Sequence, residues 1–279
     1  MRQAITAFIP HRFKVQLRRI YDSLEYNVAV RIGRRDPLLP PNWLHFAGGD
    51  YAQIGEHFFR LFVDNAGLKP HEKVLDVGCG TGRIARPLTK YLRDGSYDGI
   101  DIVAPSIMWC QRAYTPRHPN FYFHFADIYN KKYNPAGKYQ ASEYSFPFAT
   151  SAFAFVFLTS VFTHMLPQDL ENYLSEINRV LKSDGRCLIT YFLLTQDSLK
   201  LIDEKASSGA FDYELPELPG CRVRSKDVPE DAIAYDESRI RELYQKYKLN
   251  ISEPIRYGSW CGRKKGLSYQ DIVVASKLV

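Results

Sequence analysis

The chain has 279 residues, of which 45% are hydrophobic and 24% charged, and it contains no internal repeat and no low-complexity tract. This length and composition fit one large globular domain, or one domain with an appended lid. The formal net charge of +6 permits an anionic partner without requiring one.

The number and spacing of the cysteines argue against structural disulfides and against a metal site. They are odd in number, scattered and never in a CxxC pair, so we expect neither a disulfide framework nor a metal site, and a reducing compartment. They are Cys79, Cys110, Cys187, Cys221 and Cys261. Residues 1–5 lack the long apolar core of a signal peptide, and the longest apolar stretch, 146–162, is shorter than the roughly 20 residues of a membrane span. We therefore expect a cytoplasmic protein without a membrane span.

Residues up to about Arg35 alternate apolar and basic positions at helical spacing, which predicts one or two amphipathic helices. Residues 37–41 are proline-rich and mark a linker, so we divide the chain into a helical N-terminal extension, 1–45, and a main domain, 46–279. The basic residues are interpreted as a solvated helix face rather than a nucleic-acid or phospholipid patch. Asp22 and Glu25 interrupt them, and no RNA-binding signature is present.

A glycine turn at 46–51 opens the next predicted helix, which has Asp50 as its N-cap and ends at Gly67. The helix leads directly into a glycine-rich strand. Its start, at Tyr51, either faces the same crevice as that strand's end or is a capped turn and nothing more.

Strand and helix patterns then alternate. We expect strands at 74–77, 97–102, 121–128, 153–159 and 186–194, and helices at 84–92, 107–114 and 170–181. This alternation predicts a parallel sheet with right-handed crossovers.

The pattern dissolves at 195–236, where we expect a functional lid without regular structure. A helix at 237–247 and two strands at 251–257 and 269–276 follow, and the two strands form a hairpin-like ending. Its glycine-rich turn holds Trp260, Cys261 and Arg263, which either line a substrate pocket or form a loop with an exposed aromatic ring.

The run from Val74 to Arg83 is a short apolar strand that breaks into alternating glycines. In open α/β sheets a ligand binds outside the carboxyl ends of the strands, so a nucleotide-like cofactor is expected at this turn. The glycines Gly78, Gly80 and Gly82 give G-x-G-x-G, and Arg83 stands where a dinucleotide fingerprint needs its third glycine. An NAD-linked oxidoreductase is therefore disfavoured, although the strand-end acid Asp101 fits both classes.

The stretch resembles the class I S-adenosylmethionine-dependent methyltransferases, whose hallmark is an acid at a strand end followed by G-x-G-x-G. The matching residues are Asp76 to Gly82, with further agreement at Asp101, at Ala126–Asp127 and at 176–185. The resemblance covers roughly residues 68–194. It implies a doubly wound, Rossmann-like α/β sheet, mainly parallel with an antiparallel terminal hairpin, to which the helical N-terminal cap is added.

The resemblance also implies roles for single residues. Asp101 would accept from both ribose hydroxyls, Asp127 from the adenine amino group, and Asp76 would orient the loop and help to bind the methionine ammonium. Ile102 and Ile128 would sandwich the adenine ring. The expected S-adenosylmethionine-binding residues are Asp76, Gly78, Cys79, Gly80, Gly82, Arg83, Asp101, Ile102, Asp127, Ile128, Thr159 and Tyr51.

Methyl transfer needs the acceptor aligned with the methyl group, and a hydroxyl acceptor is helped by a general base. We expect His164, just past the fourth strand, to be that base; the alternative is a histidine that caps the following turn. The predicted acceptor is a small or medium metabolite, methylated at oxygen. The alternatives are an RNA methyltransferase, an NAD-linked oxidoreductase and a non-catalytic cofactor-binding regulator. Nucleic acid is disfavoured because no Asn-Pro-Pro-aromatic run follows the fourth strand.

Overall fold

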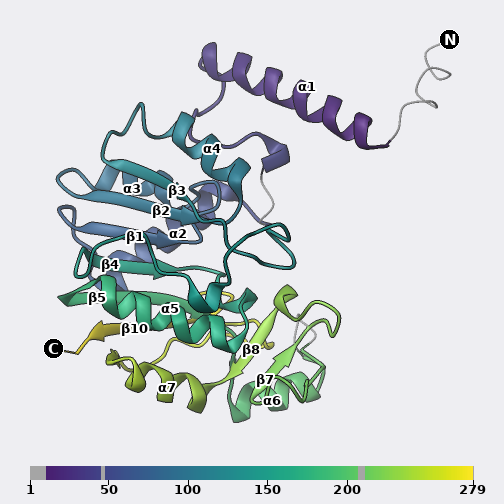
Figure 1. Cartoon of the computed structure of the whole chain (residues 1–279), viewed down its shortest axis with the longest axis vertical. Helices are drawn as coiled ribbons and strands as arrows, with labels where there is room; N and C mark the ends of the chain where they lie inside the picture. The colour runs from purple at the N-terminus through teal and green to yellow at the C-terminus, as the bar shows by residue number, and fades with distance from the viewer. Residues whose placement is uncertain (1–10, 45–47, 207–210, 279) are drawn as a thin grey trace.

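The computed structural model describes residues 11–44, 48–206 and 211–278. A seven-stranded sheet in the order β3-β2-β1-β4-β5-β10-β9 forms the centre of the molecule (Figure 1). Its strands are β1 (Lys73–Val77), β2 (Ser96–Asp101), β3 (Phe121–Phe125), β4 (Phe153–Leu158), β5 (Leu181–Tyr191), β9 (Leu249–Ile251) and β10 (Asp271–Lys277). The first five pair in parallel, and β10 runs antiparallel to both β5 and β9. The predicted Rossmann-like sheet with an antiparallel ending is confirmed.

Helices cover both faces of the sheet, because the strands are apolar on both sides. The main helices are α2 (Tyr51–Ala66), α3 (Ala85–Tyr91), α4 (Ala104–Ala113), α5 (Pro167–Val180) and α7 (Glu237–Lys246). One core joins α2, α3 and α4 to residues such as Val74 and Phe157, and a second core joins α5 and α7 to Leu75 and Val156. Short 3-10 turns occur at Asn42–Leu44, Ala141–Glu143, Phe162–His164 and Pro229–Asp231.

The order of the strands determines where a ligand can bind. β1 pairs with β2 on one side and β4 on the other, so the chain changes direction of winding between β1 and β4. In doubly wound sheets this switch point opens a crevice at the carboxyl ends of the strands. The glycine turn that follows β1 lies at this position.

The segment 195–236 is not the structureless region that the sequence predicted. It contains α6 (Gln196–Asp203), β7 (Cys221–Val223) and β8 (Ile233–Asp236), and β8 joins β6 (Leu193–Leu194) to β7 in a second, three-stranded sheet. Its short elements pack around Phe192, Phe211 and Trp260, all almost completely buried. The polar surroundings of these few apolar residues hid the strands.

Trp260 and Cys261 belong to this small core, so both expectations for the terminal turn are wrong. Trp260 is fully buried, and its Nε1 donates to Asp271 Oδ2 at 2.7 Å. Arg263 lies beside the same carboxylate and donates to Thr195 Oγ1 at 3.0 Å. These residues stabilise the junction of the two sheets.

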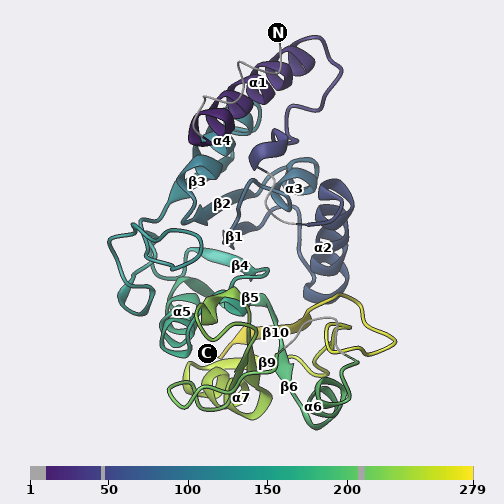
Figure 2. The same cartoon turned by 90° about the vertical axis from the view of Figure 1, so that its right-hand side faces the viewer.

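The N-terminal extension is one helix, α1 (His11–Arg31), at the opposite end of the molecule from the small sheet (Figures 1 and 2). The linker after it is tied to the domain by Arg86, whose Nε and Nη2 donate to Asp36 at 2.8 and 2.6 Å. Asp50 caps α2 as expected, since its Oδ1 accepts from the Gln53 amide, while residues 46 and 47 of the expected 46–51 turn lie outside the described residues. None of the described helices is long and apolar enough to cross a bilayer.

Candidate functional site

The turn after β1 requires glycine. Gly78, Gly80 and Gly82 all have positive φ angles, of 85°, 54° and 74°. A Cβ atom on Gly78 would lie 2.3 Å from Cγ2 of Val161, which comes from the turn after β4. The Gly78 amide donates to the Ile100 carbonyl at 2.8 Å, so the turn is fixed against β2. Side chains other than hydrogen would both strain this backbone and push the neighbouring turn away.

A cavity of about 420 Å³ opens beside this turn, at the carboxyl ends of β1, β2 and β4. Its volume is in the usual range for small-molecule and cofactor sites. The lining consists of Val77, Gly78, Gly80, Ile100, Asp101, Ile102, Val103, Ser106, Ala126, Ile128, Tyr129, Asn130, Tyr133, Ala141, Phe146, Thr159, Ser160, Val161, His164, Met165, Asp169 and Tyr173. This lining is mostly apolar and aromatic, and it includes carboxylates but neither Lys nor Arg.

Asp101, at the end of β2, connects the glycine turn to the start of α4. Its Oδ2 accepts from the Gly80 amide at 2.7 Å and its Oδ1 from the Val103 amide at 2.8 Å. Burial raises the pKa of this carboxyl, although the backbone amides oppose the shift. Each oxygen of a carboxylate has a further lone pair, so Asp101 can still accept from a ligand in the cavity.

The structure divides the predicted site residues into two groups. Those that line the cavity are Gly78, Gly80, Asp101, Ile102, Ile128, Thr159 and His164. Those outside its lining are Asp76, Cys79, Gly82, Arg83, Asp127 and Tyr51. Successive side chains of a strand point to opposite faces, which explains why Asp76 lies outside the lining. Val77 faces the cavity, so its neighbour Asp76 faces the other way.

Asp76 is buried beneath the turn. The Tyr97 hydroxyl donates to its Oδ2 at 2.6 Å, while its Oδ1 has no hydrogen-bond partner among the described residues. Burial raises the pKa of Asp76 to about 8, and the negative charge of Asp101 adds to the shift. The carboxyl is therefore largely protonated at neutral pH, and its position suits support of the loop.

Tyr51 and Arg83 also support the turn from outside the cavity. The Tyr51 hydroxyl donates to the Thr81 carbonyl at 2.5 Å, and the Arg83 guanidinium lies 5.7 Å from the centre of the Tyr51 ring. Asp127 lies between the lining residues Ala126 and Ile128 in the chain, and its carboxylate is 3.4 Å from Lys138 Nζ. The start of α2 thus touches the outside of the glycine turn rather than the crevice.

The other side of the cavity contains His164, in the 3-10 turn before α5. Its Nδ1 lies 2.9 Å from the carbonyl oxygen of Glu230. A carbonyl oxygen only accepts, so Nδ1 carries the proton of the neutral ring and Nε2 is left as an acceptor. Burial lowers the pKa of His164, which keeps the imidazole neutral and able to accept a proton at pH 7.

Sequence reasoning missed most of the lining on the His164 side of the cavity. Tyr129, Asn130 and Tyr133 come from the irregular segment between β3 and β4, and Asp169 and Tyr173 come from one face of α5. The only available signal was the aromatic character of residues 129–148. Burial raises the pKa of the Asp169 carboxyl, and the Asn130 side chain donates to the His164 carbonyl at 3.3 Å.

Ser106 is a further lining residue that the sequence did not single out. It is fully buried in the first turn of α4, and its Oγ has no hydrogen-bond partner among the described residues. A buried hydroxyl without a partner is costly unless a ligand or water satisfies it. Together with Asp101 and the open glycine turn, Ser106 fits a polar ligand. A lining with carboxylates and without Lys or Arg suits a cationic one.

Comparison with known proteins agrees with this geometry. Residues 75–189 match the sequence family described as "Methyltransferase domain". These residues form a class I S-adenosylmethionine-dependent methyltransferase domain. S-adenosylmethionine, a sulfonium cation, is the cofactor of this methyltransferase domain, and it matches the anionic, glycine-lined half of the cavity.

Among curated proteins, malonyl-(acyl-carrier protein) O-methyltransferase 1 of Ilyobacter polytropus is 32% identical over 93 residues, which are 32% of this chain and 33% of that protein. The chain spans about a third of the length of the curated relatives it matches. The PH0226 protein of Pyrococcus horikoshii OT3 shares the fold with a TM-score of 0.56 at 18% identity, covering 86% of this chain and 96% of that one. Magnesium protoporphyrin IX methyltransferase from Synechocystis PCC 6803, solved with bound SAH, gives a TM-score of 0.51 at 14% identity. The match covers 95% of this chain and 99% of that one. These likenesses concern the methyltransferase domain and its fold.

Proposed function

We propose that the chain transfers the methyl group of S-adenosylmethionine to an oxygen atom of a small or medium-sized metabolite. One observation carries this proposal. His164, held by the Glu230 carbonyl with Nε2 as its acceptor nitrogen, lines the same cavity as the glycine turn and Asp101. A cofactor bound along Gly78, Gly80 and Asp101 would thus share the cavity with a neutral base.

The lining on the His164 side supports the choice of acceptor. Tyr129, Tyr133, Phe146 and Tyr173 favour an aromatic or otherwise apolar molecule, and such side chains bind planar rings well. The lining that the structure describes has no Lys or Arg, so it favours a neutral acceptor over a phosphorylated one. The name of the Ilyobacter relative, an O-methyltransferase, points to the same acceptor atom.

The residues divide the work of methyl transfer. S-adenosylmethionine supplies an electrophilic methyl group on its sulfonium sulfur. Gly78 and Gly80 let the backbone approach the bound molecule, and Asp101 accepts from hydroxyl groups at the end of β2. His164 takes the acceptor proton on Nε2, while Nδ1 keeps its own proton and donates it in the hydrogen bond to the Glu230 carbonyl. The apolar walls keep competing water away from the reacting atoms.

Turnover against a panel of hydroxylated aromatic and aliphatic metabolites tests the proposal. We expect at least one phenol or other hydroxyl compound to yield equal amounts of S-adenosylhomocysteine and O-methylated product by mass spectrometry. Amine analogues of the same compounds and bulk tRNA serve as competing substrates. Methyl transfer only to amines or to RNA would contradict the proposed acceptor, and binding of NAD in place of S-adenosylmethionine would contradict the cofactor.

A further inference from the structure

The helix α1 presents its most apolar side to solvent. Large apolar residues recur along it at intervals of three or four positions and form one stripe, which we call the outer stripe. It consists of Phe13, Leu17, Ile20, Tyr21, Leu24 and Val28, each 53–67% exposed. A helix on the surface of a globular domain normally turns such a stripe toward the core. In α1 the arrangement is reversed.

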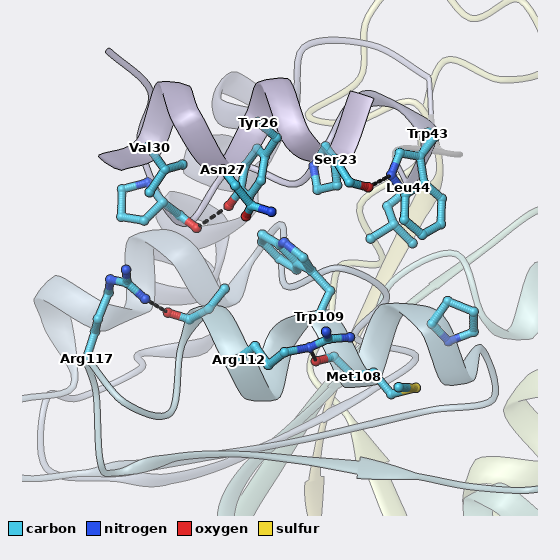
Figure 3. Close-up of a pocket in the computed structure, with 14 residues that line it drawn as sticks. Ser23, Tyr26, Asn27, Val30, Trp43, Leu44, Met108, Trp109, Arg112 and Arg117 are labelled. Carbon is cyan, nitrogen blue, oxygen red and sulfur yellow. Dashed lines mark hydrogen bonds between the residues drawn. The ribbon is translucent and has the colours of Figure 1, made fainter. Parts of the chain in front are cut away.

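The side of α1 that faces the domain is more polar and loosely packed. Ser23, Tyr26, Asn27 and Val30 point toward α4 across a cavity of about 410 Å³ (Figure 3). Polar contacts hold the helix there, because Trp43 Nε1 donates to Ser23 Oγ at 3.0 Å and the Tyr26 hydroxyl donates to the Pro37 carbonyl at 2.8 Å. These contacts fix the direction of the outer stripe without covering it.

The charge of the chain is concentrated on the same segment. Residues 1–35 contain eight Lys or Arg residues against Asp22 and Glu25, which gives a net charge of +6. This equals the net charge of the whole chain, so the remaining 244 residues balance to zero. Lys14 and Arg18, both exposed, border the outer stripe on the helix surface. The apolar stripe and the positive charge therefore occur together.

In place of the solvated helix face expected from the sequence, we propose that α1 is an interfacial anchor that lies on an anionic phospholipid bilayer, because its apolar stripe is exposed beside the basic residues. The outer stripe would enter the boundary between headgroups and acyl chains, and the basic residues would contact the headgroup phosphates. The helix has 21 residues and is about 32 Å long at 1.5 Å per residue, so it offers several turns of apolar surface in the plane of the membrane. Arg18, Arg19 and Asp22 at its middle are incompatible with a spanning orientation.

Two other occupants fit the stripe less well. A second copy of the chain would cover the apolar residues, but it would bring two segments of charge +6 together. A nucleic acid would neutralise the charge but would leave Leu17, Ile20 and Leu24 in water. A bilayer with anionic headgroups satisfies both features of α1 at once.

Co-sedimentation of the full chain with vesicles tests the proposal. We expect binding to vesicles of equal parts phosphatidylcholine and phosphatidylglycerol, and weak binding to phosphatidylcholine alone. Combined substitution of Leu17→Gln, Ile20→Gln and Leu24→Gln should weaken partition more than tenfold. Leu267→Gln is the matched control, because Leu267 is also 53% exposed but lies in the C-terminal loop. Arg18→Glu with Arg19→Glu should weaken binding to anionic vesicles, and added salt should do the same.

A second measurement does not depend on how well the triple variant folds. Tyr21→Trp places an indole on the outer stripe, and its emission should shift to shorter wavelength when anionic vesicles are added. The proposal is overturned if the wild-type chain ignores anionic vesicles at low salt, or if the stripe variants bind as well as the control. It is equally overturned if light scattering shows a dimer that the stripe substitutions dissociate while vesicle binding is absent, or if RNA binds and vesicles do not.

Discussion

The two sides of the cavity are built in different ways. One side, which we propose holds the cofactor and call the cofactor side, comes mainly from residues 77–106, in which two strand ends and a glycine turn form a single hydrogen-bonded unit around Asp101. The other side, which we propose holds the methyl acceptor and call the acceptor side, is assembled from the segment after β3, the turn after β4 and α5. Its histidine is oriented by Glu230, 66 residues further along the chain. The first side is a local motif and the second depends on the tertiary fold.

This difference has a functional consequence. Backbone amides orient Asp101, whereas a backbone carbonyl orients His164, so one side is prepared to hold a polar ligand and the other to accept a proton. Changes on one side should therefore alter cofactor affinity, and changes on the other should alter turnover or acceptor affinity. Each experiment below measures both quantities.

Substitution of the proposed base should have the largest effect. His164→Gln should lower kcat by roughly 100- to 10,000-fold, the usual contribution of a general base, and leave the affinity for S-adenosylhomocysteine unchanged. Steady-state turnover and calorimetry measure the two quantities. His118→Gln is the control, since this histidine lies in the turn between α4 and β3, outside the cavity lining. Wild-type turnover of the His164 variant would show that the histidine only caps its turn.

Substitution in the glycine turn should mainly weaken cofactor affinity, whereas substitution of His164 should mainly lower kcat. Gly78→Ala places a methyl group 2.3 Å from Val161 Cγ2 in a backbone conformation that L-residues avoid, so cofactor affinity should fall about 30-fold or more. Calorimetry with S-adenosylhomocysteine measures this loss. Gly33→Ala is the matched control, because Gly33 has a φ of 69° with no atom within 4 Å of its added Cβ. Equal losses in the two variants would mean that backbone strain, rather than the cavity wall, is responsible.

The pH dependence of kcat should report the protonation of His164, on the acceptor side. Burial lowers the pKa of His164 below its ordinary 6.5, so the base is neutral at pH 7 and becomes protonated only as the pH falls through this lowered pKa. We expect kcat to be flat near neutrality and then to drop about tenfold per pH unit on the acid side of 6.5. His164→Gln should abolish this limb. A limb centred above pH 6.5 would disagree with a buried, neutral imidazole.

The smallest expected effect concerns the rim of the acceptor side. Asp169→Ala removes a partly buried carboxyl from the lining, and loss of one hydrogen bond to the acceptor should raise its KM about two- to tenfold. Cofactor affinity should not change. A weakened affinity for S-adenosylhomocysteine would place Asp169 on the cofactor side instead and would blur the distinction between the two.

The sequence predicted what depends on local pattern. The alternation of strands and helices predicted the parallel sheet, and the motif from Asp76 to Gly82 predicted a glycine turn, which the structure places beside the cavity. The same reasoning placed Tyr51 and Arg83 in the site, whereas in the structure they support the turn from behind it. Neighbourhood in sequence does not say which way a side chain points.

The rest of the site depends on contacts between distant segments. Nothing in the residues around Glu230 indicates that its carbonyl meets His164, because a backbone group has no sequence signature. The small sheet was missed for a related reason, since β6, β7 and β8 are only two to four residues long and β6 pairs with β8 across the whole intervening segment. Such strands form only when buried residues like Phe211 and Trp260 bring them together.

The carbonyl of Glu230 belongs to the 3-10 turn that enters β8, so the hydrogen bond that fixes the Nδ1 proton of His164 comes from the segment of the small sheet, outside residues 75–189 of the methyltransferase domain. The Tyr235 hydroxyl, on β8, fastens the same region by donating to the Phe162 carbonyl at 2.9 Å. Removal of the small sheet would leave Nδ1 without this carbonyl, and the proton of the neutral ring could then lie on either nitrogen. Correct protonation of His164 would then require that residues 195–236 are packed in place. A chain that has bound S-adenosylmethionine before this segment packs would hold a methyl donor without a correctly protonated base.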